Sequence, residues 1–346
     1  MAETLRVGIT RDFMADDGTV ALGDIGLGLL DDAASIKWEF LAERTGELTA
    51  CQIHGYDALA VLGPRITSAT VDGADWLTVI ARYGVGYDTI DIDACTRNGV
   101  AVTITPDGVR RPMATAILTL ILALSGRLLQ KDRLTRSGGW DRKVDHMGMG
   151  LTGRVLGSIG CGNIGRELFT LARPLAMRHI AHDPYARPDP ALGVELVDLE
   201  TLFRTADFVV INCALTPETR HLVNAARLAL MKPTAFLINT ARGPIVDQAA
   251  LAKALQAGWI DGAALDVFER EPVDPDDPLL TLDNVIVTPH ALGWTDEWIH
   301  LTGRSALAGI LDVADGREPP NVVNHEVLET QRFQDKLARN AARGAT

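Results

Sequence analysis

The sequence predicts an α/β protein with two doubly wound domains. The chain has 346 residues, more than the roughly 250–300 at which one hydrophobic core stops growing. Short apolar runs alternate with helical patterns along most of its length, as strands and helices do around parallel sheets. The run Gly160 to Gly165 has the spacing Gly-x-Gly-x-x-Gly between an apolar segment and a helical pattern. Together these features favour two Rossmann-like open sheets covered by helices.

The first part of the chain, up to about Pro106, has the pattern of a small α/β unit. A helical pattern covers Asp31 to Thr45. The expected strands are Val7 to Thr10, Ala58 to Leu62, Leu77 to Arg82 and Val100 to Thr103.

Pro112 to Lys131 is expected to form one long helix. Apolar residues cover most of its circumference, and such a helix must be buried nearly all round. We expect it in the core between the domains or, as the alternative, also in a dimer interface. Gly138 and Gly139 then indicate a loop.

From Thr152 onward, apolar strands and helices alternate again, which favours a doubly wound parallel sheet. The expected strands are Val155 to Ile159, Ile180 to His182, Phe208 to Asn212, Ala235 to Asn239, Gly262 to Asp266 and Val285 to Thr288. A helix to about Asp315 follows, and Asn321 to Asn324 indicates a return to the first domain. Residues beyond Glu326 are polar and fit a peripheral helix or tail. The expected domains are 1–106 with 297–346, and 107–296.

Composition excludes several classes of partner. The net charge of −12 disfavours nucleic acid and anionic membranes, because both attract clustered Lys and Arg. No uninterrupted apolar run reaches the ~18 residues that a membrane span needs, and the polar start of the chain fits no signal peptide, so we expect a cytoplasmic protein. The four cysteines lack metal-binding or disulfide spacing, so no metal site is indicated.

The glycine run indicates dinucleotide binding. Gly160 permits a tight turn, Gly162 lets a pyrophosphate approach the backbone, and Gly165 lets the helix pack on its strand. The N–H groups of Asn163 and Ile164 would face the phosphates. Asp183 lies eighteen residues after Gly165, near the ~20 expected for a carboxylate that binds ribose hydroxyls. The alternative is a structural glycine turn.

Asp183 also favours NAD over NADP, since its carboxylate would repel a 2′-phosphate. Arg187 nearby weakens that preference.

Three further segments end predicted strands with polar residues: 238–243, 265–272 and 287–293. Ligands bind at the carboxyl ends of strands in open α/β sheets. In order and spacing these segments, with Arg82 to Asp91, resemble the signatures of the D-isomer specific 2-hydroxyacid dehydrogenase family. That family includes glyoxylate/hydroxypyruvate reductases, phosphoglycerate dehydrogenase-like enzymes, and formate and phosphite dehydrogenases. The resemblance covers essentially the whole chain.

The chemistry of 2-oxo acid reduction accounts for three of these residues. His290 would supply the proton, because imidazole titrates near neutral pH. Glu271 would bind the other ring nitrogen and fix the tautomer. Arg242 presents a planar fork that can bind the carboxylate and polarise the carbonyl. Taken singly, each has an ordinary alternative: a structural histidine, a turn glutamate or a surface arginine.

The resemblance implies a split, flavodoxin-like substrate domain beside an NAD-binding Rossmann domain, with a cleft that closes over the substrate. It implies that Asp266 binds the nicotinamide carboxamide; a turn cap is the alternative. It assigns cofactor contacts to Gly160, Gly162, Asn163, Ile164, Gly165, Asp183, Thr216, Thr240, Ala241, Asp266 and Gly293. It assigns substrate contacts to Tyr83, Gly84, Val85 and Gly86, of which the last three would use backbone N–H groups.

The chain also departs from the family pattern. Thr89, the segment Met113 to Thr115, and Trp294 differ from the residues that many members have at these places. Arg110 and Arg111 form an unusual pair before Pro112. We expect one of them to bind a second anionic group of the substrate; the alternative is that both are solvated or paired with interdomain or dimer carboxylates.

The sequence therefore predicts an NAD-dependent oxidoreductase that transfers a hydride between nicotinamide and a D-2-hydroxy acid/2-oxo acid pair. Its partner would be a small anionic substrate, and the protein would be a homodimer. The alternatives are a formate or phosphite dehydrogenase and an NADH-sensing binding protein of the corepressor type.

Overall fold

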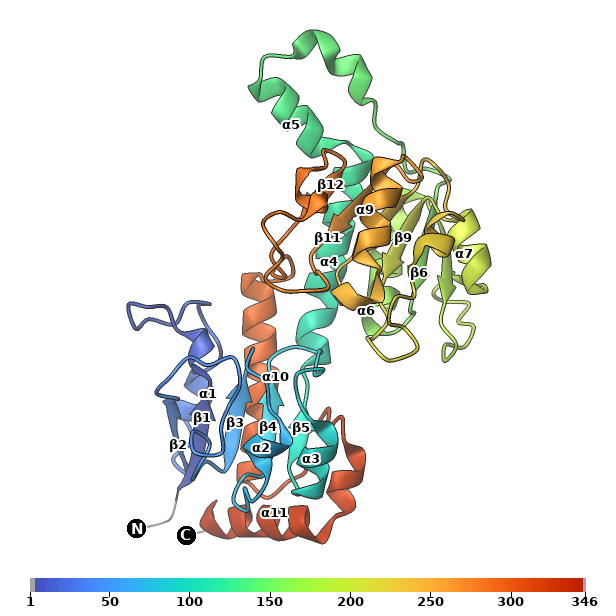
Figure 1. Ribbon diagram of the computed structural model, residues 1–346. Coiled ribbons are helices and arrows are strands. Elements are labelled where there is room, and N and C mark those ends of the chain that lie inside the picture. Colours follow the sequence, from blue (N-terminus) through green and yellow to red (C-terminus); the bar gives the residue numbers. More distant parts are fainter. Residues whose placement is uncertain (1–3, 345–346) are drawn as a thin grey trace. The chain divides into compact units, whose positions relative to one another are not determined.

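The computed structural model describes residues 4–344, and the chain divides into two compact units (Figure 1). Unit 1 comprises Met1–Val109 and Trp294–Thr346, and unit 2 comprises Arg110–Gly293. The chain enters unit 2 within helix α4 (Pro106–Ser125) and returns to unit 1 just before helix α10 (Asp296–Ala314).

Unit 1 is built on a five-stranded parallel sheet with the strand order β2-β1-β3-β4-β5. Its strands are β1 (Leu5–Ile9), β2 (Ile36–Phe40), β3 (Ala58–Val61), β4 (Val79–Arg82) and β5 (Ala101–Thr103). Its other helices are η1 (Arg11–Phe13), α1 (Gly28–Asp31), α2 (Ser68–Val71), α3 (Ile92–Arg97), η6 (His325–Glu329) and α11 (Gln331–Gly344). The central strands are buried on both faces, as parallel strands covered by helices must be.

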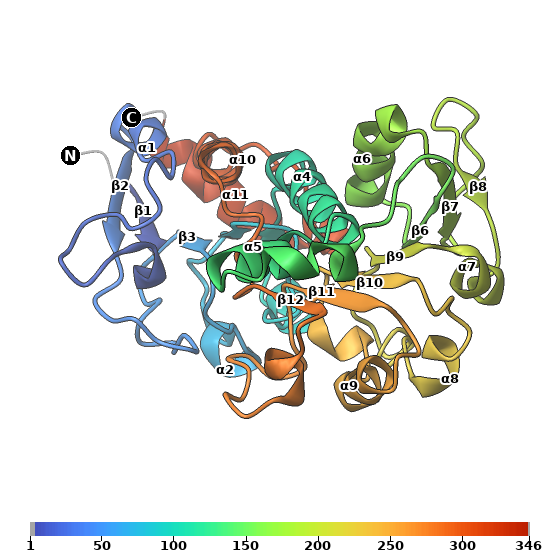
Figure 2. The ribbon, with the colours of Figure 1, turned by 90° about the horizontal axis from the view of Figure 1, so that it is seen from above.

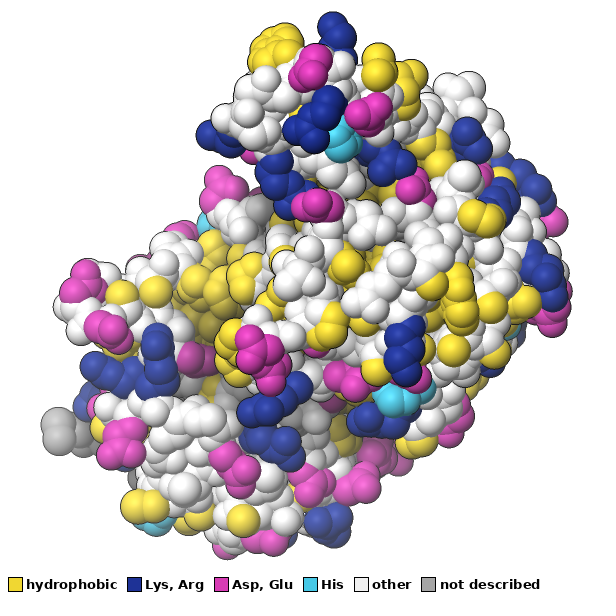
Figure 3. All heavy atoms as spheres, turned by 45° about the horizontal axis from the view of Figure 1, so that its top comes forward, with side chains coloured by type: hydrophobic (Ala, Val, Ile, Leu, Met, Phe, Trp, Pro, Cys, Tyr) yellow, Lys and Arg dark blue, Asp and Glu magenta, His cyan; other side chains and the backbone are white. Residues whose placement is uncertain are grey.

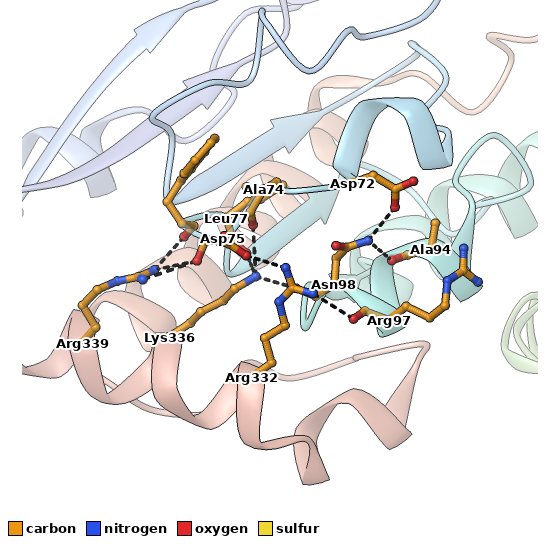
Figure 4. Close-up of polar contacts among 11 residues, drawn as sticks. Asp72, Ala74, Asp75, Leu77, Ala94, Arg97, Asn98, Arg332, Lys336 and Arg339 are labelled. Atoms are coloured by element: carbon orange, nitrogen blue, oxygen red, sulfur yellow. Dashed lines mark hydrogen bonds and ion pairs between the residues drawn. The ribbon is translucent and has the colours of Figure 1, made fainter.

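The end of the chain completes unit 1, as the sequence indicated. The amide of Val102 in β5 donates to the side chain of Asn324. Helix α11 crosses the segments that lead into β4 and β5, where the buried Lys336 donates to the carbonyl oxygens of Ala74, Leu77 and Asn98 (Figure 4). The last helix is therefore an integral part of the unit.

Unit 2 is built on a seven-stranded parallel sheet with the order β12-β11-β10-β9-β6-β7-β8. Its strands are β6 (Val155–Ile159), β7 (Arg178–His182), β8 (Glu195–Leu196), β9 (Phe208–Ile211), β10 (Phe236–Asn239), β11 (Gly262–Leu265) and β12 (Val285–Val287). Its helices are α5 (Leu128–Arg136), η2 (Trp140–His146), α6 (Asn163–Ala172), η3 (Arg173–Leu175), α7 (Leu199–Thr205), α8 (Ala225–Leu228), η4 (Gly243–Ile245), α9 (Gln248–Gln256) and η5 (Pro278–Thr281).

Helices cover both faces of the unit 2 sheet (Figure 2). The second half of α4 packs with α6 on one face, around Ile117, Phe169 and Val210. Helices α7, α8 and α9 cover the other face, around Phe203, Leu237 and Leu251. The sheet is thus buried on both faces, which accounts for its nearly continuous apolar strands.

Strand register brings three loops to one edge of the unit 2 sheet. Asn239 at the end of β10 pairs with Leu265 at the end of β11, and Leu265 pairs with Val287 at the end of β12. Because the strands are parallel, the loops that follow them leave the same edge. These loops carry the predicted Arg242, Asp266 and His290.

The predicted strands are present, with ends shifted by one or two residues. The helix predicted over Asp31 to Thr45 is wrong, because Ile36–Phe40 forms the edge strand β2. There the apolar side chains alternate with Lys37 and Glu39, and pairing with β1 outweighs the helix propensity of those charged residues. The very short β8 was not predicted.

The long helix predicted over Pro112 to Lys131 is two helices, α4 and α5. Gly126 and Arg127 separate them, and Arg127 has φ = 50°, which no α-helix residue adopts. The expectation that the helix is buried nearly all round is also wrong, since Leu122 and Leu128 are exposed. By length and composition alone α4 could cross a membrane, and 56% of the relevant window is buried within the fold.

Candidate active site

The glycine turn joins β6 to α6, and its three glycines have different surroundings. A Cβ atom on Gly160, which has φ = +99°, would lie 2.8 Å from the backbone of Asn212, and one on Gly165 would lie 2.7 Å from the carbonyl oxygen of Gly160. A Cβ on Gly162 would meet nothing within 4 Å. Gly160 and Gly165 are therefore required by the fold, whereas Gly162 keeps an open approach to the backbone.

Helix α6 begins at this turn. Gly162 is its N-cap and provides no side-chain cap for the first N–H groups, which include those of Asn163 and Ile164. Uncapped N–H groups at a helix N-terminus bind phosphate well. The turn therefore fits the pyrophosphate of a dinucleotide.

Asp183 lies directly after β7 and reaches back to the turn. One of its carboxylate oxygens accepts from the amide of Cys161 at 2.8 Å, and the other accepts from the amide of Tyr185 at 2.9 Å. The carboxylate is thus held beside the glycine turn, where a ribose bound with the pyrophosphate would lie.

Sequence reasoning missed two residues that shape this turn. The buried Ser158 hydroxyl donates to the carbonyl oxygen of Gly160 at 2.7 Å, and the side chain of Asn212 donates to Ser158 at 2.9 Å. A hydroxyl in an otherwise apolar buried strand was the available signal.

The remaining cofactor candidates lie in loops of the same unit. Thr216 forms a local turn in which its amide donates to the hydroxyl of Thr219 at 2.7 Å. Thr240 is buried at the end of β10, and the amide of Ala241 donates to the side chain of Asn239 at 3.1 Å. These contacts fix the loops and do not by themselves identify a ligand.

His290 and Glu271 form a hydrogen-bonded pair. Nδ1 of His290 lies 2.7 Å from Oε2 of Glu271, and the amide of Phe268 donates to Oε1 of the same carboxylate at 3.0 Å. The carboxylate is therefore engaged on both oxygens. Its bond to Nδ1 leaves Nε2 of His290 as the ring nitrogen for other partners.

The charges around Glu271 are consistent with a cationic partner. Burial alone would raise the pKa of Glu271, but the hydrogen bonds from His290 and Phe268, with the charges of His290 and Arg242, hold it below its ordinary value. Arg242 follows β10, and its guanidinium donates to the carbonyl oxygen of Ala241 at 2.7 Å. The three predicted catalytic residues therefore belong to one electrostatic cluster.

Asp266 organises the loop that carries His290. This buried carboxylate uses Oδ1 to accept from the hydroxyl of Thr288 at 2.6 Å and from the amides of Ala291 and Leu292 at 3.1 and 3.2 Å. His290 between them has φ = 56°, an unfavourable conformation for a residue with a Cβ. Such strain persists only where the surroundings over-determine it, and here Asp266 provides that constraint.

Gly293 closes the same loop against α4. A Cβ on Gly293 would lie 2.1 Å from Sδ of Met113, so a larger residue would require the Met113 side chain to move. Met113, one of the departures from the family pattern, therefore packs directly beneath this loop.

The predicted substrate loop of unit 1 follows β4. Tyr83 is fully buried and its hydroxyl donates to the carbonyl oxygen of Ile25 at 3.0 Å. The amides of Tyr83 and Gly84 donate to Val61 and Thr105. Within residues 4–344, the amides of Val85 and Gly86 have no hydrogen-bond acceptor.

Arg110 and Arg111 both pair with Glu167 on α6. The guanidinium of Arg111 lies 2.6 Å from one oxygen of that carboxylate, and Nε of Arg110 lies 3.8 Å from the other. About half of each arginine side chain is exposed. Glu167 belongs to the same unit as both arginines, so this pairing is not one of the interdomain or dimer contacts raised as the alternative.

Comparison with known proteins places this chain in a known family. The model of the D-isomer specific 2-hydroxyacid dehydrogenase NAD-binding domain matches residues 118–291. The chain is 38% identical over 300 residues to a glyoxylate reductase from Korarchaeum cryptofilum, covering 85% of this chain and 90% of the relative. It is 38% identical over 321 residues to a glyoxylate reductase from Thermococcus onnurineus, covering 89% and 95%.

A solved structure shares the fold of this chain. The crystal structure of the TT0316 protein from Thermus thermophilus has 34% identity and a TM-score of 0.81, covering 92% of this chain and 100% of that one.

The fold and the matched cofactor domain define an NAD(P)-dependent oxidoreductase that acts on 2-hydroxy acids, with NAD as cofactor. Within that class, the chain belongs to the D-isomer specific 2-hydroxyacid dehydrogenase family. The predicted family, two-domain Rossmann-like fold class, enzyme class and cofactor are confirmed.

Proposed function

We propose that this enzyme reduces small 2-oxo acids, glyoxylate and hydroxypyruvate first among them, to their D-2-hydroxy acids. The observation that carries the proposal is the pair of His290 and Glu271, in which a carboxylate engages Nδ1 and leaves Nε2 as the ring nitrogen that would meet a substrate oxygen. The similarity to glyoxylate reductases supports the choice of substrates.

The glycine turn supports the cofactor assignment through Gly162, whose open side would accept the pyrophosphate. When bound, NADH supplies the hydride. Asp266 would bind the carboxamide through Oδ2, since Oδ1 accepts three hydrogen bonds and Oδ2 accepts only the longer one from the amide of Leu292 at 3.4 Å. Asp183 favours NADH over NADPH, because its fixed carboxylate would repel a 2′-phosphate.

His290 gives a proton from Nε2 to the carbonyl oxygen as that oxygen gains negative charge. Glu271 fixes the tautomer and orientation of the ring and stabilises its protonated form. Arg242 binds the substrate carboxylate with its guanidinium and polarises the carbonyl. In unit 1, Val85 and Gly86 are further candidates for binding a carboxylate through their backbone N–H groups.

We also propose a homodimer that forms through the arm of residues 126–149, which contains α5 and η2. The exposed apolar side chains of the arm are Leu128, Leu129, Trp140, Val144 and Met147. The part of the arm visible in Figure 3 shows hydrophobic side chains among basic ones. Several large apolar side chains exposed on one segment favour a protein interface, and the molar mass in solution tests the assignment.

The central experiment compares wild type with His290→Asn, using glyoxylate, hydroxypyruvate, formate and phosphite as substrates and both nicotinamide cofactors. Loss of the general acid should lower kcat by about 10² to 10⁴, while the Kd for NADH stays unchanged. His300→Asn is the matched control, because His300 pairs with Asp24 at 3.2 Å in unit 1. Turnover of formate or phosphite alone, or NADH binding without turnover, would refute the proposal.

A further inference from the structure

Unit 2 contains a second histidine–carboxylate pair, which the chemistry above does not use. Nε2 of His221 lies 2.9 Å from Oε1 of Glu269, and the two side chains are 44% and 36% exposed. The same oxygen accepts from the amide of Gln248 at 3.0 Å. The amide of Glu269 in turn donates to the side chain of Gln248 at 2.9 Å. Glu269 is therefore joined to two separate segments of the chain.

The first of these segments lies alongside the residues that follow Arg242. The amide of His221 donates to the carbonyl oxygen of Pro244 at 2.8 Å. Val223 forms a parallel bridge with Val246. The position of His221 thus fixes the backbone two residues beyond Arg242.

Packing ties the same backbone to the segment that carries Glu271. A Cβ on Gly243 would lie only 1.9 Å from the carbonyl carbon and oxygen of Phe268. The residue after Arg242 therefore presses against the peptide between Phe268 and Glu269. The amide of Phe268 in turn holds the carboxylate of Glu271.

Two sets of contacts therefore connect the segment of Arg242 with the segment of Glu271. The first is the packing of Gly243 against Phe268. The second is the pair of Glu269 with His221, whose amide bonds to Pro244. An ion pair this exposed contributes little to the free energy of unfolding. Its effect on the reaction rate can be larger, because a displacement of about 1 Å at a catalytic group can cost roughly 10²-fold in rate.

We infer that His221 and Glu269 are positioning residues that set the guanidinium of Arg242 relative to the Glu271–His290 pair. The inference rests on the proposed function, since it assumes that Arg242 binds the substrate carboxylate. Neither residue needs to touch the substrate. Their effect passes through the backbone of residues 242–245.

The test compares Glu269→Ala and His221→Ala with wild type. Displacement of Arg242 should raise KM for glyoxylate and lower kcat, with a combined loss in kcat/KM of about 10-fold to 10²-fold. The Kd for NADH and the midpoint of the pH profile of kcat should stay unchanged, because the glycine turn and the Glu271–His290 pair are intact. Glu269→Gln keeps an oxygen for the Gln248 amide and should restore part of the activity.

A double variant tests whether both residues act through one contact. Glu269→Ala combined with His221→Ala should be no worse than the more damaging single change, since both remove the same link. Asp24→Asn, which breaks the His300 pair in unit 1, is the matched control and should keep wild-type kinetics.

Wild type and Arg242→Ala serve as references that distinguish a failure of the proposed function from a failure of the positioning role. If wild type reduces no 2-oxo acid, or Arg242→Ala keeps wild-type kcat/KM, the proposed function fails. If those references behave as proposed while the alanine variants keep wild-type kcat/KM, the positioning role is overturned. Lower melting temperatures with unchanged kinetics of the folded protein, in either the alanine variants or Glu269→Gln, would also overturn it.

Discussion

In both sheets the strand order reverses beside the first strand, but only unit 2 leaves this position open to a ligand. In unit 1 the chain moves from β1 to one side for β2 and to the other for β3, and in unit 2 it moves from β6 to one side for β7 and to the other for β9. Each first strand thus borders a switch point, where open α/β sheets bind ligands.

In unit 1 the protein's own groups occupy this place. The hydroxyl of Thr10 accepts from the amide of Leu62 at 3.2 Å. The buried ring of Phe13 packs edge-on against Tyr83 with 4.6 Å between the ring centroids. In unit 2, by contrast, the open side of Gly162 and the uncapped start of α6 face outward. The comparison shows that topology alone does not leave an open site, whereas the glycine turn of unit 2 does.

The strongest test of this comparison changes the glycines of the turn. Gly160→Ala places a Cβ against the backbone at a positive φ, so it should destabilise unit 2 by at least about 1–3 kcal/mol and abolish measurable NADH binding. Gly162→Ala meets no protein atom. It should keep the melting temperature of the cofactor-free protein while weakening NADH by roughly 10-fold to 10²-fold, the loss of one charge-assisted hydrogen bond.

Gly28→Ala in unit 1 is the control, because a Cβ there also meets nothing within 4 Å. Equal NADH affinity in the Gly162 variant and wild type would show that the open backbone is not the phosphate site.

A second test asks whether unit 2 also binds a second anionic group. Arg110→Ala and Arg111→Ala are compared on glyoxylate and on a 2-oxo acid with a distal carboxylate. If one guanidinium leaves Glu167 to bind that carboxylate, its loss should cost about one to two decades in kcat/KM on the larger substrate alone. Equal losses on both substrates, or none, would leave the two arginines as partners of Glu167.

The last expected effect concerns the stability of unit 1, where the buried Lys336 lies. Burial, with the charges of Arg332 and Arg339, lowers the pKa of Lys336 to about 7, against the opposing effect of Asp75 and Cys95. Above that pH the unfolded chain binds a proton that the folded chain lacks, so stability should rise with pH between about 7 and 10, by at most ~1.4 kcal/mol per pH unit.

Urea unfolding at several pH values measures this effect. Lys336→Met should remove the slope, whereas Lys253→Met, at an exposed position on α9, should keep it. Identical slopes in wild type and Lys336→Met would assign the pH dependence to other groups.

The pattern of apolar residues along the chain predicted most of the strands and helices, and the elements that it missed have physical explanations. The strands of unit 2 were predictable because burial on both faces requires continuous apolar runs. Strand β2 was not, because an edge strand with Lys37 and Glu39 has the composition of a helix. The break after α4 depends on the left-handed conformation of Arg127, which side-chain periodicity does not report.

The candidate site was predictable in its residue types but not in its contacts. The glycine spacing and the strand-end residues indicated the chemistry. The contacts of Asp266 with the His290 loop, of Ser158 with Asn212, and of Glu269 with His221 join residues far apart in sequence. No local pattern encodes such partners.

The way the chain is divided between the two units also sets the order in which their residues are synthesised. All of unit 2 lies within one continuous stretch, while unit 1 needs both ends of the chain. Lys336 bonds to a carbonyl 262 residues earlier, and Asn324 to an amide 222 residues earlier. A ribosome making this protein therefore releases every residue of the cofactor-binding unit before it has supplied the helix that closes the first. The N-terminal sheet, although synthesised first, is covered on this side only after residues 324–344 have been made.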